Sequence, residues 1–384
     1  MRKRHTIVFG IGLTAATAMS AVPVSAASPE APTSAYIVTF ARGTDANVEA
    51  AKLRRAGGEI DHTYTSVLSG VAADLTKGEL TTLLRNPNVV SVTADTPVYA
   101  LGTQQSPPAW GIDRIDQPAL PLSGSYGYPD TAGAGVTVYV VDTGLRADHV
   151  EFTGRVAPGF TVINDGYGTG DCEGHGTHVA GTAAGSTFGV AKQATVVPVR
   201  VLNCSGSGSL SGVIAGLDWI AANHTTGPAV ANLSLGGAAS ASLDEAVNRV
   251  IADGVTVVVA AGNSNADACG VSPARAPAAL TVGATTTSDA RASYSNVGPC
   301  LDLFAPGSGI NSAWWTSSTS VATLSGTSMA APHVAGAAAL IAGQNPSWTP
   351  AQVAAQLVAS ATVGAVASAG TTSPNRLLFV PADT

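Results

Sequence analysis

The chain has 384 residues and a formal net charge of −7, and only 11% of its residues are charged, against about 25% in typical soluble proteins. This scarcity of charge and the 43 glycines exclude a disordered chain and predict a compact, well-packed fold. No basic cluster follows the N-terminus, so nucleic acid is not an expected partner.

The first residues, MRKRHTIVFGIGLTAATAMSAVPVSAAS, have the pattern of a secretory signal peptide. Arg2, Lys3 and Arg4 are positive, an apolar stretch follows, and small residues around Ala26 form a cleavage site. A membrane anchor is the alternative, but the apolar stretch is short and ends in that cleavage pattern. We therefore expect residues 1–27 to be removed and the product to be secreted, extracellular and not membrane-bound.

Residues 28–103 are expected to form a small first domain. AYIVTF (35–40), GVAADL (70–75) and VVSVTAD (89–95) are typical of strands, and two helical runs end at Gly57 and before Pro87. The order β-α-β-β-α-β matches a ferredoxin-like α+β unit. The polar, proline-containing stretch over residues 99–110 predicts a linker.

Residues 104–384 are expected to form a second, larger domain. The predicted strands cover residues 136–142, 195–201, 229–235, 255–261, 279–284 and 301–306. The predicted helices cover residues 177–185, 210–224, 243–254, 328–345 and 350–361. Short apolar strands alternating with helices predict an α/β fold, in which helices flank a parallel sheet on both faces. Functional sites in such folds lie at the carboxyl ends of the strands.

Three polar residues stand at the ends of these predicted strands and helices. Asp142 ends an almost wholly apolar strand, His175 lies between two glycines before a helix, and Ser328 begins an alanine-rich helix. Taken singly, each is explained as a turn residue, a loop histidine or a helix cap. Taken together, they supply the nucleophile, the base and the orienting acid that serine catalysis requires.

The chain order separates two classes of serine hydrolase. The α/β-hydrolases place the serine before the acid and the histidine. After Ser328 only His333 and Asp383 remain, in the reverse order, and GTSMA lacks the last glycine of the nucleophile elbow. The order Asp142, His175, Ser328 is instead that of subtilisin.

The segments VVDTG, GHGTHVAGT, ANLSLGG, AAGNSNADAC, DLFAPG and GTSMAAPHVAG occur in order over residues 110–380. With them the chain resembles the subtilases, the subtilisin-like serine proteases, and within these the proteinase K branch and its aqualysin-type secreted bacterial members. The N-terminal unit resembles the inhibitor-type propeptide of the family. Ala331 departs from the threonine that is common in this branch, at a position that follows the nucleophile.

The resemblance implies a subtilisin-like fold and a secreted serine endopeptidase, made as a self-processing precursor with broad specificity. Ser328 would be the nucleophile, His175 the general base, Asp142 its partner and Asn263 the oxyanion donor. The implied substrate-binding residues are Gly206, Ser207 and Gly208 on one edge, Ser234, Leu235 and Gly236 on the other, and Ala260, Ala261 and Gly262 in the S1 pocket. This pocket would prefer aromatic or large aliphatic P1 residues.

The resemblance also implies partners and cross-links. Structural calcium would be bound by Pro277, Ala279 and Asp302, and by Asp113, Asp116 and Gln117 with Ser123 and Ser125 nearby. No catalytic cofactor is implied. The expected partners are protein or peptide substrates and the chain's own propeptide, as intramolecular chaperone and inhibitor, and we expect a monomer. Spacing alone leaves three pairings of the four cysteines open; the resemblance implies Cys172–Cys204 and Cys269–Cys300.

Two rival hypotheses and one further motif bear on this interpretation. An inactive subtilase that only binds is disfavoured by the intact catalytic residues, and a sulfonyl fluoride would test it. A metallopeptidase using His175 and His178 lacks the H-E-x-x-H motif, and zinc-reversible inactivation by a chelator would favour it. The run GSGSLSG does not have the spacing of a dinucleotide-binding loop.

Overall fold

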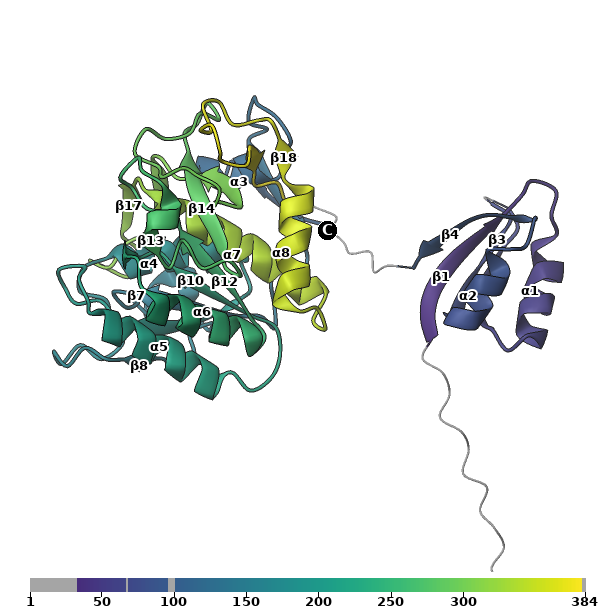
Figure 1. Ribbon diagram of the computed structural model, residues 1–384, viewed down its shortest axis with the longest axis horizontal. Coiled ribbons are helices and arrows are strands. Elements are labelled where there is room, and N and C mark those ends of the chain that lie inside the picture. Colours follow the sequence, from purple (N-terminus) through teal and green to yellow (C-terminus); the bar gives the residue numbers. More distant parts are fainter. Residues whose placement is uncertain (1–32, 67, 96–100, 382–384) are drawn as a thin grey trace, which may run out of the picture. The chain divides into compact units, whose positions relative to one another are not determined.

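The computed structural model describes residues 33–66, 68–95 and 101–381, so the predicted signal peptide lies outside the described residues. The chain divides into two compact units, Met1–Pro97 and Val98–Thr384, which Figure 1 shows as ribbons. This division falls a few residues before the predicted domain boundary at residue 103. Within the described ranges, no helix combines the length and apolarity that crossing a membrane requires.

The first unit has a four-stranded antiparallel sheet and two helices. Its elements are β1 (Thr33–Phe40), α1 (Ala46–Arg55), β2 (Glu59–Tyr64), β3 (Gly70–Thr76), α2 (Lys77–Leu83) and β4 (Val89–Ala94). The strand order is β2-β3-β1-β4. Val38 and Phe40 alternate along β1 and join one buried cluster with Ala50 and Leu53 of α1. The predicted ferredoxin-like unit is therefore present.

The second unit contains the remaining elements. Its strands are β5 (Leu101–Gln105), β6 (Ser125–Pro129), β7 (Thr137–Asp142), β8 (Phe160–Thr161), β9 (Thr195–Arg200), β10 (Ala229–Leu233), β11 (Gly237–Ala238), β12 (Val255–Ala260), β13 (Val271–Ser272), β14 (Leu280–Thr285), β15 (Leu303–Pro306), β16 (Ile310–Ala313), β17 (Val321–Leu324), β18 (Thr362–Val363) and β19 (Arg376–Leu377). Its helices are α3 (Trp110–Ile115), α4 (His175–Ala184), α5 (Leu210–Asn223), α6 (Ala241–Ala252), α7 (Thr327–Gln344) and α8 (Pro350–Ser360), with short 3₁₀ turns at Val150–Phe152 and Ala268–Gly270.

A nine-stranded sheet in the order β18-β19-β15-β14-β12-β10-β7-β9-β8 forms the centre of this unit. Its strand pairs are parallel except β18 with β19. Both faces are buried: Val138 and Val140 of β7 pack in a cluster with α4 and α7, whereas Tyr139 and Val141 pack with α5 and α6. This alternation along one strand is the physical basis of the predicted α/β fold.

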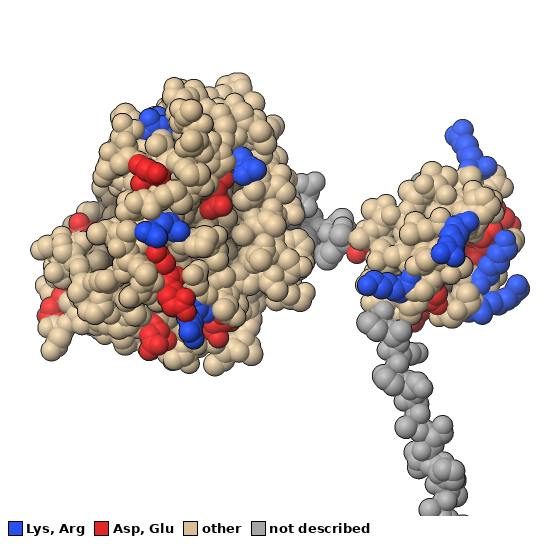
Figure 2. Space-filling model, viewed as in Figure 1, with Lys and Arg blue, Asp and Glu red and all other residues tan. Residues whose placement is uncertain are grey.

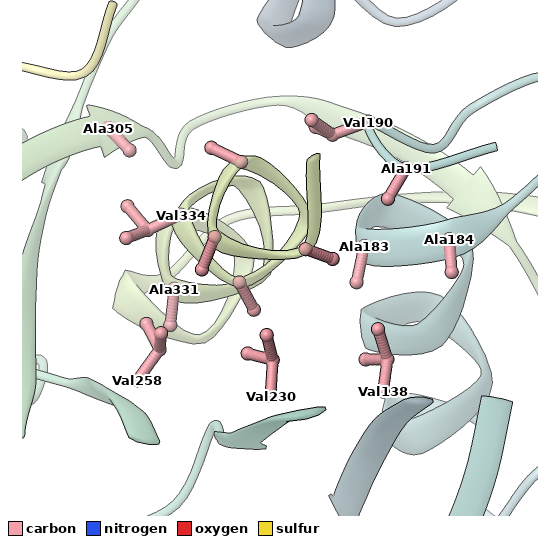
Figure 3. Close-up of a cluster of buried hydrophobic side chains, with 14 of the residues drawn as sticks. Val138, Ala183, Ala184, Val190, Ala191, Val230, Val258, Ala305, Ala331 and Val334 are labelled. Carbon is pink, nitrogen blue, oxygen red and sulfur yellow. The ribbon is translucent and has the colours of Figure 1, made fainter. Parts of the chain in front are cut away.

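Helix α7 lies against the middle of the sheet and is almost entirely buried. Figure 3 shows Val258 of β12 next to Ala331 of this helix, with Val230 of β10 and Val138 of β7 following along the sheet toward Ala183 of α4. Its many alanines and glycines let its backbone approach the sheet closely, because small side chains leave little to separate the two layers. The packing fixes the N-terminus of α7, and with it the position of Ser328.

The predicted linker over residues 99–110 is the main difference from the sequence analysis. Leu101–Gln105 forms β5 and pairs antiparallel with β6, and a helix follows from Trp110. Polar composition and prolines suggested a linker because pairing with a strand some 20 residues ahead leaves no local signal. The chain from Leu101 onward therefore belongs structurally to the second unit.

Charged side chains are sparse on the surface of the second unit. On the face shown in Figure 2 they lie singly or in small mixed groups among uncharged residues. This distribution agrees with the low charged fraction of the chain.

Candidate active site

The candidate catalytic residues come from neighbouring strands of the sheet. Asp142 is the last residue of β7, Ser234 follows β10, and Asn263 follows β12, and these three strands are adjacent. Parallel strands bring their carboxyl ends to one edge of the sheet, so residues far apart in sequence meet there. His175 and Ser328, at the beginnings of α4 and α7, line the same groove as Asn263.

His175 is held by a buried carboxylate. Its Nδ1 lies 2.8 Å from Oδ1 of Asp142, which is fully buried and also accepts the N–H of Thr143. The preceding Gly174 has φ 116°, and a Cβ there would collide with Trp314 and Trp315. Glycine is therefore required both for the backbone turn into α4 and for the close packing of two tryptophans beside the histidine.

A second carboxylate, Asp171, organises the loop that carries the histidine. It accepts the N–H groups of Glu173, Gly174 and Thr177, and the hydroxyl of Thr143, at 2.8–3.0 Å. Because Thr143 follows Asp142, these bonds fix the loop to the end of β7. The sequence analysis missed Asp171, because its bond to Thr143 joins residues 28 apart in the sequence and leaves no local pattern.

The electrostatic surroundings favour a protonated His175. Burial lowers its pKa, but the charge and hydrogen bond of Asp142, with the charges of Glu173 and Asp171, outweigh burial and raise the pKa above the usual 6.5. A histidine acting as a general base must be neutral. If His175 is the general base, we expect kcat/KM to increase as the pH rises through this raised pKa, which a pH–rate profile measures.

Ser328 is positioned by reciprocal hydrogen bonds with Ser234. The Ser328 hydroxyl donates to the carbonyl of Ser234 at 3.1 Å, and the Ser234 hydroxyl donates to the carbonyl of Ser328 at 2.8 Å. The side chain of Asn232 in β10 donates to the Ser234 hydroxyl at 2.9 Å. These bonds attach the first turn of α7 to the end of β10.

Asn263 has its side-chain amide fixed by Thr327. Its Oδ1 accepts the N–H of Thr327 at 2.8 Å and the Thr327 hydroxyl at 2.9 Å. The NH₂ end is therefore left to donate elsewhere. A Cβ on Gly326 would lie 3.5 Å from Nδ2 of Asn263 and 3.6 Å from the backbone nitrogen of Ser328. Two nitrogens that carry N–H groups thus lie close to one point beside the serine.

The groove has a volume of about 1070 Å³. It is lined by Gly206, Ser207 and Gly208 after β9, and by Ser234, Leu235 and Gly236 after β10. Ala260 and Gly262 also line it. Ala261 does not: it is fully buried in a cluster with Ala268 and Phe304, because its side chain points away from the groove. The other predicted subsite residues all line the groove.

His178 lies apart from the groove. Its Nε2 is 3.0 Å from the carbonyl of Ile310 and 3.2 Å from that of Ala322, so it donates to backbone oxygens. Burial lowers its pKa to about 4. Nε2, which donates to the carbonyls, has no lone pair for a metal, and the buried Nδ1 has no hydrogen-bond partner among the described residues and does not reach the groove that His175 lines. His175 and His178 are therefore not arranged as a metal pair.

The two predicted calcium-binding groups occupy different places. Asp113, Asp116 and Gln117 lie in and after α3, where Asp113 and Gln117 accept the N–H of Ser123. Oδ1 of Asp116 is buried without a hydrogen-bond partner. Burial, with the charge of Asp113, raises the Asp116 pKa to about 6.

The second group lies at the start of β14. Asp302 accepts the N–H of Thr281 at 2.8 Å, which places its carboxylate beside the segment that contains Pro277 and Ala279. Burial raises its pKa to about 6. Both groups offer hard oxygen ligands and lack sulfur, as calcium prefers. A cation would compensate the buried charge, so the residues present fit this ion.

Two disulfides are present, Cys172–Cys204 and Cys269–Cys300. This is the pairing that the family resemblance implies. The first joins the histidine loop to the segment before Gly206, and the second joins the segment after Asn263 to the end of the β14–β15 connection. Each closes a loop of about 30 residues near the groove, which limits the conformations of the unfolded chain.

The carboxyl edge of this parallel sheet brings an aspartate, a histidine and a serine to one groove, an arrangement typical of serine hydrolases. The Subtilase family model matches residues 133–377, and the Peptidase inhibitor I9 model matches residues 35–101. The chain therefore belongs to the subtilase family and is an extracellular serine endopeptidase with an I9-type propeptide domain.

Individual relatives agree with this assignment. The chain is 50% identical to an extracellular serine proteinase of Thermus sp. (strain Rt41A), over 99% of this chain and 100% of that protein. It is 49% identical to alkaline serine exoprotease A of Vibrio alginolyticus, over 84% of this chain and 60% of that protein. The crystal structure of a cold adapted subtilisin-like serine proteinase has 53% identity and a TM-score of 0.68, covering 71% of this chain and 98% of that one.

Proposed function

We propose that this endopeptidase cleaves proteins with broad specificity through an acyl-enzyme on Ser328, and that it processes its own precursor. The observation that carries the proposal is the 2.8 Å bond between His175 and Asp142 in a groove that also contains Ser328 and Asn263. Casein hydrolysis by the purified protein, abolished by a sulfonyl fluoride, is the expected result. Hydrolysis that persists after complete sulfonylation of Ser328 would contradict it.

Each residue has a defined step in this mechanism. The Ser328 hydroxyl leaves the carbonyl of Ser234, donates its proton to Nε2 of His175 and attacks the substrate carbonyl. Such catalytic hydrogen bonds often form only once substrate is bound. Asp142 holds the Nδ1 proton and stabilises the imidazolium, which then protonates the leaving amine. Water then attacks the carbonyl of the acyl-enzyme ester, with His175 again taking the proton. The ester bond breaks, which releases the second product and restores the Ser328 hydroxyl.

Negative charge on the substrate oxygen is stabilised at the N-terminus of α7. Nδ2 of Asn263 and the backbone nitrogen of Ser328 lie 3.5 and 3.6 Å from the same point, the position of a Cβ on Gly326, and the helix dipole favours an anion there. These donors are held before substrate arrives, by Thr327 and by the packing of α7. They therefore need little reorganisation when the charge develops.

Substrate is proposed to bind as an extended strand between two edges of the groove. Gly206, Ser207 and Gly208 form one edge and Ser234, Leu235 and Gly236 the other. Main-chain pairing of this kind supplies affinity that is largely independent of sequence. Discrimination among substrates is left to the pockets for individual side chains, and this accounts for a broad specificity.

The S1 pocket is expected to prefer aromatic and large aliphatic P1 side chains. Its walls, formed around Leu235 and Ala260, carry no charge to pair with a buried lysine or glutamate, and an unpaired buried charge is costly. Filling an apolar pocket with phenylalanine or leucine gains roughly 1.5–3 kcal/mol. The measurement is kcat/KM for peptide anilides that differ only at P1. Higher values for arginine or glutamate than for phenylalanine would refute the assigned pocket.

The I9-type domain is proposed to assist folding and then to inhibit the enzyme. The catalytic domain depends on parallel pairing between distant strands, which is slow to form, and a folded domain that binds it can lower that barrier. The yield of active enzyme from residues 104–384 should rise when residues 28–103 are added during refolding. An equal yield without them would argue against this role.

Calcium is proposed as a structural cofactor at the two oxygen-rich groups. Asp113, Asp116 and Gln117 would hold one ion and Asp302, with the carbonyls of Pro277 and Ala279, another. Bound calcium would supply charge compensation for buried carboxylates and stabilise the fold by mass action. Calcium should therefore raise the melting temperature of the inhibited enzyme, less so in the Asp116→Asn variant. A melting temperature insensitive to calcium would contradict both sites.

A further inference from the structure

Glu173 is the one acidic residue among the described residues that line the groove. Apart from His175, the other lining residues are uncharged. Glu173 forms no ion pair with any described cation, and one of its oxygens, Oε1, has no hydrogen-bond donor among the described residues. The groove therefore contains a single negative charge that the protein itself leaves uncompensated.

The position of this charge is well defined. Oε2 accepts the backbone N–H of His175 at 2.7 Å. Oε1 lies 3.8 Å from the position that a Cβ atom on Gly206 would occupy. The carboxylate thus stands between the catalytic histidine and one of the two proposed substrate-binding edges. The hydrogen bond from His175 accounts for the position of Oε2 only. A glutamine side chain could accept the same bond, so this bond does not require a negative charge at residue 173.

The geometry of an extended substrate indicates which side chain meets Glu173. Successive side chains of a strand point in opposite directions. If the P1 side chain enters the pocket at the ends of β10 and β12, the P2 side chain points the other way, toward His175. Glu173 lies on that side, beside the edge that follows β9.

We propose that Glu173 forms an S2 subsite that selects lysine or arginine at P2 and disfavours acidic residues there. The inference rests on the proposed function, because it uses the same groove and the same substrate direction. A long basic side chain places its ammonium or guanidinium group near Oε1 while its methylenes lie along the groove. Since Glu173 is partly exposed, the attraction is moderate and is screened by salt.

The test uses three peptide anilides with phenylalanine at P1 and lysine, glutamine or glutamate at P2. At low salt the wild-type ratio of kcat/KM for lysine over glutamate should be roughly five to ten. It should fall toward one in Glu173→Gln, which keeps an acceptor for the His175 N–H. Glu245→Gln is the matched control: it removes the same charge from α6, outside the groove, where Glu245 pairs with Arg249, and should keep the wild-type ratio.

Wild-type enzyme alone supplies a second measurement that needs no folded variant. Its lysine-to-glutamate ratio should decline as salt rises to about 0.5 M, because screening shortens the reach of the charge. Equal rates for the three peptides, or a ratio that persists in Glu173→Gln, would overturn the S2 assignment alone. If none of the three peptides is cleaved, the proposed function fails and the inference fails with it.

Discussion

Ser328→Ala is expected to lower kcat by roughly 10⁶-fold, the size of the loss when the nucleophile of subtilisin is removed. The precursor of this variant should also keep its I9-type domain covalently attached. Without the hydroxyl there is no acyl-enzyme, and water attack assisted only by the oxyanion donors is far slower. The same chemistry is proposed to cut the chain between its two domains, so both activities should disappear together.

The variant should still fold, because little of the fold depends on this hydroxyl. It donates one hydrogen bond, to the carbonyl of Ser234, and such a bond contributes about 1 kcal/mol. The reciprocal bond uses the backbone carbonyl of Ser328 and is kept. Loss of activity is therefore expected to arise from chemistry and not from unfolding, which circular dichroism of the purified precursor can show.

Mass spectrometry of the secreted protein measures the state of the precursor. The matched control is Ser325→Ala, which removes a hydroxyl three residues away that contacts the N–H of Gly309 and does not line the groove. It should mature normally. Expression must use a host that lacks other extracellular proteases. A Ser328→Ala protein that matures to the normal mass in such a host would show that another enzyme does the processing.

The candidate catalytic residues could be picked out from the sequence because each has a local signature. Asp142 ends an apolar strand, His175 begins a helix after glycine, and Ser328 begins a helix of small residues. The alternation of apolar strands and helices predicted the parallel sheet, and the sheet requires strand ends to meet at one edge. These are short-range patterns, which survive in a single sequence.

The residues that hold the site could not be predicted in the same way. Asp171 binds Thr143, and Thr327 binds Asn263, across separations of 28 and 64 residues. Strand β5 was mistaken for part of a linker because its partner β6 lies elsewhere in the chain. Glu173 gave no signal of its own, since a lone acid in a loop is ordinary until the groove around it is seen to be uncharged. Such contacts depend on tertiary packing, which local patterns do not encode.

Asn263→Ala is expected to lower kcat by roughly 10²–10³-fold with little change in KM. This range was measured for the loss of such a donor in subtilisin, a member of the same family. The bond from Nδ2 is strongest when negative charge has formed on the substrate oxygen, so its loss raises the barrier more than it weakens substrate binding.

Asn263 also accepts two hydrogen bonds from Thr327, so the substitution could act by loosening the start of α7. Thr327→Val separates the two effects, because it removes the hydroxyl's bonds to Asn263 and to the N–H of Gly262 but keeps the Nδ2 donor and the Thr327 N–H that fixes it. It should cost kcat much less than Asn263→Ala. Steady-state kinetics with one peptide anilide compares the variants. If Asn263→Ala raises KM and leaves kcat unchanged, or if Thr327→Val is equally inactive, Asn263 acts through structure and not on the oxyanion.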